Sequence, residues 1–187
     1  LGRTSELHIH CPSQLQEVIE LQLKVSDTRL RYPLTFNYLN FVPGEMLFEN
    51  DTVSVQSIVL KHRIPCSGFL FKEKIKERNL RKGVIDKYKI PLVEIERIKN
   101  GSDFINNGGQ IIPNKELTLP LKIPRSYAYC SDTAYNESIV SDITGVDLLY
   151  HESTFMEDKK ERAKETFHST ALDAAKIAKS ALVKQLV

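Results

Sequence analysis

The chain has few cysteines and no long hydrophobic run, and both shortages exclude classes of protein. Its 187 residues include three cysteines, an odd number with no Cys-x-x-Cys pair. This argues against a disulfide framework or a structural zinc knuckle, so Cys11, Cys66 and Cys130 are expected to be reduced packing residues. No apolar run reaches the roughly 18 residues of a membrane helix, and residues 1–5 form no signal-peptide hydrophobic region. We therefore expect a cytoplasmic protein.

Positive charge is unevenly distributed along a chain whose net charge is only +2. Between residues 72 and 100, ten Lys or Arg accompany five Asp or Glu. Clusters of this kind bind a phosphate backbone through counterion release, without reading bases. The alternative is a solvated charged face with no ligand. The candidate RNA-binding residues are Lys74, Lys76, Arg78, Arg81, Lys82, Lys87 and Lys89.

Hydrophobic periodicity predicts mixed strands and helices, and hence an α/β fold with one sizeable core. Strands are expected at residues 7–10, 34–39, 46–48, 53–60, 68–71, 127–130 and 146–150. Helices are expected at residues 13–24, 81–88, 92–99 and 170–182, with a helix-like segment at 136–144. The last helix is expected to pack against a sheet through a face of small residues formed by Ala171, Ala174, Ala175, Ala178, Ala181 and Leu182.

Polar side chains follow two of the expected strands. Asp132 comes after residues 127–130, and His151 and Glu152 come after residues 146–150. If the two strands are parallel, these side chains arrive at the same edge of a sheet. His168 precedes the last helix, for which Asp173 is a plausible capping partner. Taken singly, each has an ordinary alternative: Asp132 as a turn or helix cap, and His151 as a strand-end residue bonded to backbone.

The order of these elements resembles the metallo-β-lactamase superfamily, and within it the ribonuclease Z endonucleases. The similar motifs are the Ser-Asp-Thr turn at Asp132, the His-Glu-Ser-Thr box at 151–154 and the His-Ser-Thr loop at His168. The segment from Leu60 to Phe69, with His62, resembles the family segment that carries a zinc-binding histidine. The resemblance implies an αββα sandwich and a zinc-dependent hydrolase that removes the 3′ trailer of precursor tRNA.

The resemblance also implies a role for each matching residue. His62 and Asp132 would bind zinc, two ions in a complete site, with the aspartate as a bridge. His168 would deliver a proton to the departing 3′ oxygen, oriented and charged by Glu152. No role follows for His151.

One family motif is absent from the chain. Members of the family carry a His-x-His-x-Asp-His sequence and a histidine near the C-terminus, and neither occurs here. We therefore expect residues 1–187 to form a single but incomplete domain that binds zinc weakly or not at all. The alternatives are a non-catalytic fragment that binds RNA, or another phosphodiesterase of the superfamily.

The resemblance also implies a function for the basic segment. Ribonuclease Z carries an inserted arm after the strand that follows the zinc-binding histidine, and residues 72–104 occupy that position. The segment is expected to be a flexible arm that clamps precursor tRNA away from the cleavage site. The resemblance further implies a homodimer.

Overall fold

The computed structural model describes residues 2–187. These residues form two compact units. Unit 1 comprises residues 2–49, 54–72 and 126–187, and unit 2 comprises residues 50–53 and 73–125. Unit 2 includes most of the basic segment, together with the chain that returns from it.

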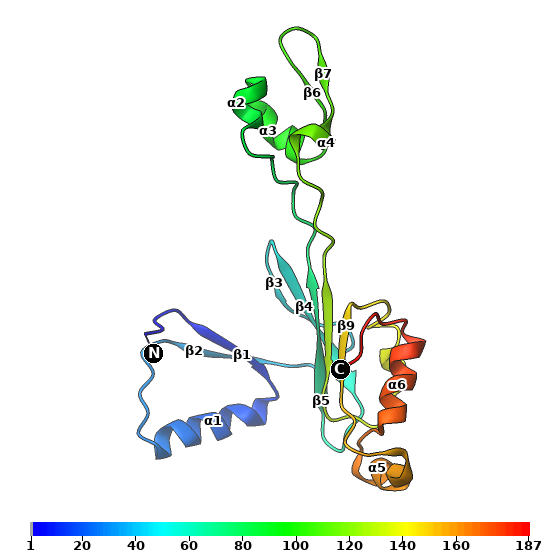
Figure 1. Cartoon of the computed structure of the whole chain (residues 1–187). Helices are drawn as coiled ribbons and strands as arrows, with labels where there is room; N and C mark the ends of the chain where they lie inside the picture. The colour runs from blue at the N-terminus through cyan, green and yellow to red at the C-terminus, as the bar shows by residue number, and fades with distance from the viewer. Residues whose placement is uncertain (1) are drawn as a thin grey trace. The chain divides into compact units, whose positions relative to one another are not determined.

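A five-stranded sheet forms the centre of unit 1 (Figure 1). Its strands, in spatial order, are β3 (Met46–Glu49), β4 (Val53–Leu60), β5 (Cys66–Glu73), β8 (Ser126–Cys130) and β9 (Leu148–His151). Strand β5 is antiparallel to β8, whereas β8 and β9 are parallel. The parallel pair brings the ends of β8 and β9 to the same edge of the sheet.

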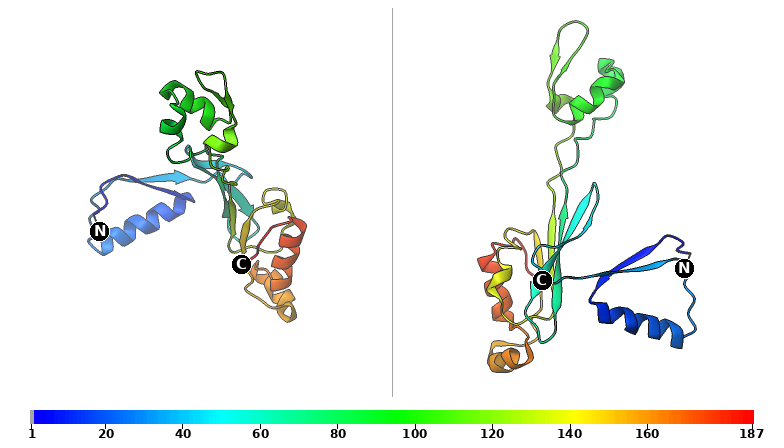
Figure 2. Two further views of the ribbon diagram at one scale, coloured as in Figure 1. Left: turned by 45° about the horizontal axis from the view of Figure 1, so that its top comes forward. Right: turned by 180° about the vertical axis from the view of Figure 1, so that it is seen from behind.

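One face of this sheet is buried beneath helix α6 (Ala171–Ser180), which lies beside the strands in Figures 1 and 2. Ile58, Leu149 and Ile177 are fully buried between the sheet and the helix. Burying each such side chain contributes about 1.5–3 kcal/mol. The core therefore stabilises the strands whose ends carry the polar motifs.

The buried face of α6 is narrower than the sequence pattern indicates. Ala174, Ala178 and Ala181 are buried as expected, whereas Ala171, Ala175 and Leu182 are exposed. The helix ends at Ser180, and Leu182 lies beyond it with a φ of 53°. The expected capping partner is confirmed, because Thr170 and Asp173 form a reciprocal capping box.

The other elements that the sequence pattern predicts in unit 1 are present, with one exception. Strand β1 (Leu7–Cys11) is parallel to β2 (Leu34–Tyr38), and α1 (Ser13–Val25) connects them. The segment expected to be helix-like at 136–144 contains only the 3-10 helix η1 (Glu137–Ile139) followed by turns. Its buried Ile139 and Ile143 pack into the core without a continuous helix. The 3-10 helix η2 (Glu157–Lys159) and helix α5 (Lys160–Thr166) complete the unit.

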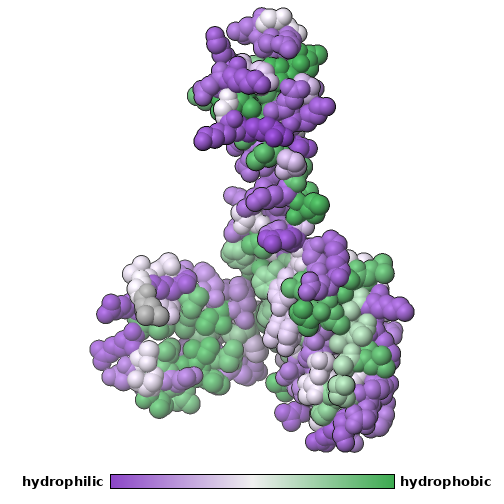
Figure 3. Space-filling view, in the orientation of Figure 1, coloured by the Kyte–Doolittle hydropathy of each residue, from purple (hydrophilic) through white to green (hydrophobic). Residues whose placement is uncertain are grey.

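Unit 2 has a small hydrophobic core of its own. It contains α2 (Val84–Tyr88), α3 (Leu92–Lys99), the paired strands β6 (Phe104–Ile105) and β7 (Ile111–Ile112), and α4 (Asn114–Leu117). The core residues are Val84, Ile90, Ile98, Phe104, Ile112 and Leu117. Helix α2 begins three residues later than expected, because Gly83 has a left-handed φ of 78°. Hydrophilic residues cover most of the visible surface of unit 2 in Figure 3.

The cysteines and the helix lengths bear on the composition of the chain. Cys11, Cys66 and Cys130 are all free, and two of them, Cys11 and Cys130, are buried. Burial raises the pKa of the Cys130 thiol to about 12, so it is a packing residue rather than a nucleophile. Within residues 2–187, no helix combines the length and the apolar character that crossing a bilayer requires.

Candidate functional site

The motif residues meet at one edge of the five-stranded sheet. Cys130 at the end of β8 lies opposite His151 at the end of β9, so Asp132 and Glu152 leave the sheet together. His62 follows β4, and His168 lies in the loop between α5 and α6. The sequence-based prediction that parallel strands bring Asp132 and Glu152 to one edge is confirmed.

Three of these side chains form a cluster of metal-binding groups. One ligand atom from each of His62, Asp132 and His168 lies within 4.8 Å of the other two. The imidazole centroids of His62 and His168 are 5.4 Å apart, with their planes at 71°. Asp132 is exposed, and both histidines are half-buried. Among residues 2–187 this is the one group of three or more His, Cys, Asp or Glu close enough to share an ion.

The cluster fits the metal that the fold family implies. An imidazole nitrogen and a carboxylate oxygen are ligand types that zinc prefers, and His62 and Asp132 offer one of each. The exposed Asp132 leaves the cluster open on one side, so a water or a substrate oxygen could reach it.

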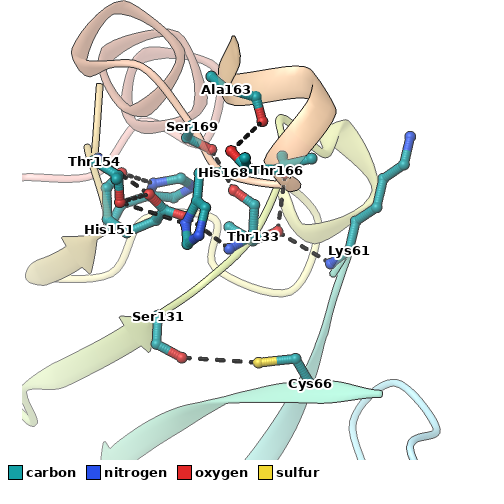
Figure 4. Close-up of polar contacts among 12 residues, drawn as sticks. Lys61, Cys66, Ser131, Thr133, His151, Thr154, Ala163, Thr166, His168 and Ser169 are labelled. Carbon is teal, nitrogen blue, oxygen red and sulfur yellow. Dashed lines mark hydrogen bonds and ion pairs between the residues drawn. The ribbon is translucent and has the colours of Figure 1, made fainter. Parts of the chain in front are cut away.

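Glu152 lies behind this cluster with both carboxylate oxygens bonded. Its Oε1 accepts from the Thr133 amide and from His168 Nδ1, each at 2.8 Å. Its Oε2 accepts from the amide and the hydroxyl of Thr154, at 3.1 and 2.7 Å. The carboxylate is thereby fixed in position, with its side chain only 6% exposed. Figure 4 shows Thr133, Thr154 and His168 gathered at this point.

Glu152 is ionised in this environment. Burial by itself raises the pKa of a carboxyl group, but the hydrogen bonds from Thr154, Thr133 and His168 outweigh it and lower the pKa of Glu152. Because a carboxylate only accepts, His168 Nδ1 donates to Glu152, which leaves Nε2 for a metal or a substrate.

Two hydroxyl residues of the sequence motifs, to which no individual role was assigned, hold the site loops together. Fully buried Thr133 accepts from the Lys61 amide at 3.0 Å through its hydroxyl. Its carbonyl accepts from the hydroxyl of fully buried Ser169 at 2.6 Å. These two bonds join the loops of His62, Asp132 and His168. Their signal in the sequence is that Thr133 belongs to the Ser-Asp-Thr turn and Ser169 to the His-Ser-Thr loop.

His151 is a strand-end residue next to a backbone carbonyl, which is the ordinary alternative given for it from the sequence. The residue is buried at the end of β9, and its Nδ1 lies 2.8 Å from the backbone carbonyl of Glu152. Burial lowers the pKa of His151, so the ring is neutral near pH 7.

The seven candidate RNA-binding residues all lie in unit 2. Lys76, Arg81, Lys82, Lys87 and Lys89 are exposed, whereas Lys74 and Arg78 are half-buried. Two of the exposed cations have partners: Arg81 donates to the Lys115 carbonyl at 3.3 Å, and Lys87 lies 4.6 Å from the centre of the Tyr88 ring. Most of the seven side chains are therefore exposed to solvent, but two of the exposed ones already interact with other residues of unit 2.

Comparison with curated proteins finds close relatives along the whole chain. The chain is 46% identical over all 187 residues to ribonuclease Z of Bacteroides fragilis, and 48% identical to ribonuclease Z of Parabacteroides distasonis. It spans 62% of the length of each of these proteins. No protein-family model matches the chain.

Comparison with solved structures gives the fold. The short form of human tRNase Z aligns with 97% of this chain at a TM-score of 0.61 and 20% identity, and the aligned part is 60% of that protein. The metallo-β-lactamase fold protein YhfI of Bacillus subtilis aligns with 97% of the chain at a TM-score of 0.55 and 14% identity, over 50% of that protein. The chain is therefore similar along its entire length to part of bacterial ribonuclease Z, and its fold is that of the metallo-β-lactamase fold proteins.

Proposed function

We propose that this protein is a zinc-dependent endoribonuclease that removes the 3′ trailer from precursor tRNA. The observation that carries the proposal is the convergence of His62, Asp132, Glu152 and His168 at one sheet edge. The ribonuclease Z relatives support the same reaction and substrate.

Four residues of the chain have separate roles in the proposed hydrolysis. His62 and Asp132 would hold zinc, which, when bound, supplies an activated water and stabilises charge on the phosphodiester oxygens. His168 would deliver a proton from Nε2 to the 3′ oxygen as its bond to phosphorus breaks. Glu152 holds the imidazolium through Nδ1 at 2.8 Å and balances its charge. The products would be a tRNA with a 3′ hydroxyl and a released trailer.

Unit 2 is proposed to bind the RNA. It contains twelve Lys or Arg and eight Asp or Glu, whereas the rest of the chain has a net charge of −2. Because its exposed cations are on a separate compact unit, they could anchor tRNA without entering the metal cluster. A cytoplasmic location and a homodimer complete the proposal, as the family resemblance implies.

The test compares a precursor tRNA carrying a 3′ trailer with bis(p-nitrophenyl) phosphate, at fixed zinc concentration. Because residues 1–187 alone supply few zinc ligands and span 62% of the length of the ribonuclease Z relatives, we expect a single cleavage at the trailer junction when the chain is part of a protein of the relatives' full length. The variant Glu152→Gln should reduce kcat by about 10²–10⁴, the usual contribution of general acid catalysis, and Ser153→Ala, which changes an exposed neighbour, should not.

Two outcomes would overturn the proposal in different ways. Cleavage of the simple ester alone would indicate another phosphodiesterase of the superfamily. Salt-dependent binding of tRNA with no cleavage of either compound would indicate an RNA-binding piece, which the positive charge of unit 2 also allows.

A further inference from the structure

His151 is a buried polar side chain that the proposed reaction does not use. It is 4% exposed and directly precedes Glu152. Among the residues that the structure describes, its Nε2 is the one buried side-chain nitrogen or oxygen with no hydrogen-bond partner. An unpaired buried acceptor or donor costs free energy, so a histidine here calls for an explanation.

The partner of Nδ1 determines the form of the ring. The backbone carbonyl of Glu152 has only lone pairs to offer, so the Nδ1 atom of His151, 2.8 Å away, must carry a hydrogen. In a neutral imidazole, Nε2 is then a bare acceptor. A leucine would fill a similar space without the unpaired Nε2. The one polar interaction that distinguishes this histidine from an apolar residue is thus the bond from Nδ1–H to the Glu152 carbonyl.

That bond fixes the backbone from which the Glu152 side chain extends. The amide of Glu152 donates to the Cys130 carbonyl at 3.0 Å, and its carbonyl accepts from His151, so both ends of the residue are tied. The amide of His151 donates in turn to the carbonyl of Val187 at 3.3 Å. Rotation of the peptide after Glu152 would break the His151 bond and would move Thr154, whose amide and hydroxyl hold Oε2.

We propose that His151 is a positioning residue, which acts through its Nδ1–H to lock the Glu152 backbone so that the carboxylate faces His168. The inference rests on the proposed function for its effect on cleavage, but the positioning itself is a property of the protein without substrate. It adds to the site a buried residue that touches neither metal, RNA nor the reacting atoms.

Three substitutions at one position test the proposal. In His151→Asn the amide nitrogen takes the place of Nδ1 and keeps the donor. In His151→Gln the amide nitrogen lies near the place of Nε2, and in His151→Leu there is no donor. We expect His151→Asn to cleave precursor tRNA within about threefold of the unsubstituted protein. The Gln and Leu variants should lose about 10–100-fold in kcat with little change in KM, the usual cost of losing an orienting partner.

Thermal unfolding of each variant separates positioning from stability. If cleavage rates follow the order of melting temperatures instead of the presence of the donor, the proposal is wrong. Equal activity of the Leu and Asn variants would also overturn it, because the donor would then be unnecessary.

A readout that needs neither activity nor metal keeps this test separate from that of the proposed function. Nitrogen-15 NMR of the imidazole rings should show His151 protonated at Nδ1 and bare at Nε2. The Nδ1 proton of His168, bonded to Glu152, should be visible in the unsubstituted protein and in His151→Asn and lost to solvent exchange in His151→Leu. Protonation of His151 at Nε2, or an unchanged His168 proton in His151→Leu, would refute the positioning role even if tRNA cleavage is observed. Failure of cleavage with the expected spectra would refute only the proposed function.

Discussion

His168 differs from the other two members of the metal cluster, because its Nδ1 is already bonded to Glu152. We predict that His62→Ala and Asp132→Ala each reduce zinc binding at least tenfold, since each removes a ligand. His168→Ala should bind zinc nearly as well as the unsubstituted protein and lose cleavage. Equilibrium dialysis with zinc measures the first effect, and His8→Ala, an exposed histidine of β1, is the control. Equal loss of zinc in His168→Ala would make that residue a ligand instead of a proton donor.

The burial of His151 makes stability depend on pH. Burial lowers the pKa of the folded protein's His151 below its ordinary value of 6.5, so the unfolded chain takes up a proton first as the pH falls. The contribution to stability is thus complete above about pH 6.5 and is lost as the pH falls toward the lower, folded-state pKa, with a slope of at most about 1.4 kcal/mol per pH unit.

The variant His151→Asn removes this titration. We therefore predict that the difference in free energy of unfolding between the unsubstituted protein and His151→Asn shifts in favour of the variant between pH 6.5 and pH 5. Urea unfolding at several pH values measures it. A difference that does not change with pH would show that the folded protein admits the protonated ring.

At the scale of elements, β5 and β8 approach closely at a glycine. A Cβ atom on Gly68 would lie 2.5 Å from the carbonyl oxygen of Tyr129, closer than any side chain tolerates. Because this oxygen belongs to the backbone, β5 and β8 would have to move apart to make room. Strand β5 follows the loop of His62, and β8 precedes the loop of Asp132.

We predict that Gly68→Ala lowers the free energy of unfolding by about 1–3 kcal/mol, the usual cost of overpacking. The matched control is Gly108→Ala in the turn between β6 and β7, where the nearest atom is the Asn106 side-chain oxygen at 3.4 Å. Denaturant unfolding of both variants checks the prediction, and equal stabilities would contradict it. A zinc affinity that falls only in Gly68→Ala would further show that the strand spacing sets the cluster.

At the scale of the whole molecule, positive charge and metal ligands lie in different compact units. The double variant Lys82→Glu, Lys89→Glu reverses two exposed charges of unit 2. We predict weaker tRNA binding, and the slope of log K against log salt should fall by about one for each phosphate that the protein no longer neutralises. Hydrolysis of bis(p-nitrophenyl) phosphate should be unaffected.

A second double variant controls for net charge. Lys176→Glu with Lys179→Glu makes the same change on exposed positions of α6 in unit 1. Filter binding of labelled precursor tRNA at several salt concentrations compares the two. If both variants weaken binding equally, total charge and not unit 2 determines RNA affinity.

The sequence by itself determined the strands of unit 1, the main helices and the residues of the candidate cluster, but not the short strands β6 and β7 of unit 2. Alternating and helical periodicities depend on neighbours within a few residues, so they appear without tertiary information. The positions of Asp132 and Glu152 after two strands likewise required only chain order and the geometry of parallel pairs.

Only the tertiary structure decided which other residues support the site. The bonds from Lys61 to Thr133 and from Ser169 to Thr133 join residues 72 and 36 positions apart, and no local pattern predicts them. The same holds for the close approach of Gly68 to Tyr129 and for the unpaired nitrogen of His151. The segment at 136–144 has a helix-like sequence but forms a 3-10 helix and turns, with Ile139 and Ile143 buried in the core. Each of these features depends on contacts between residues far apart in the sequence, and only the packing of the folded chain determines those contacts.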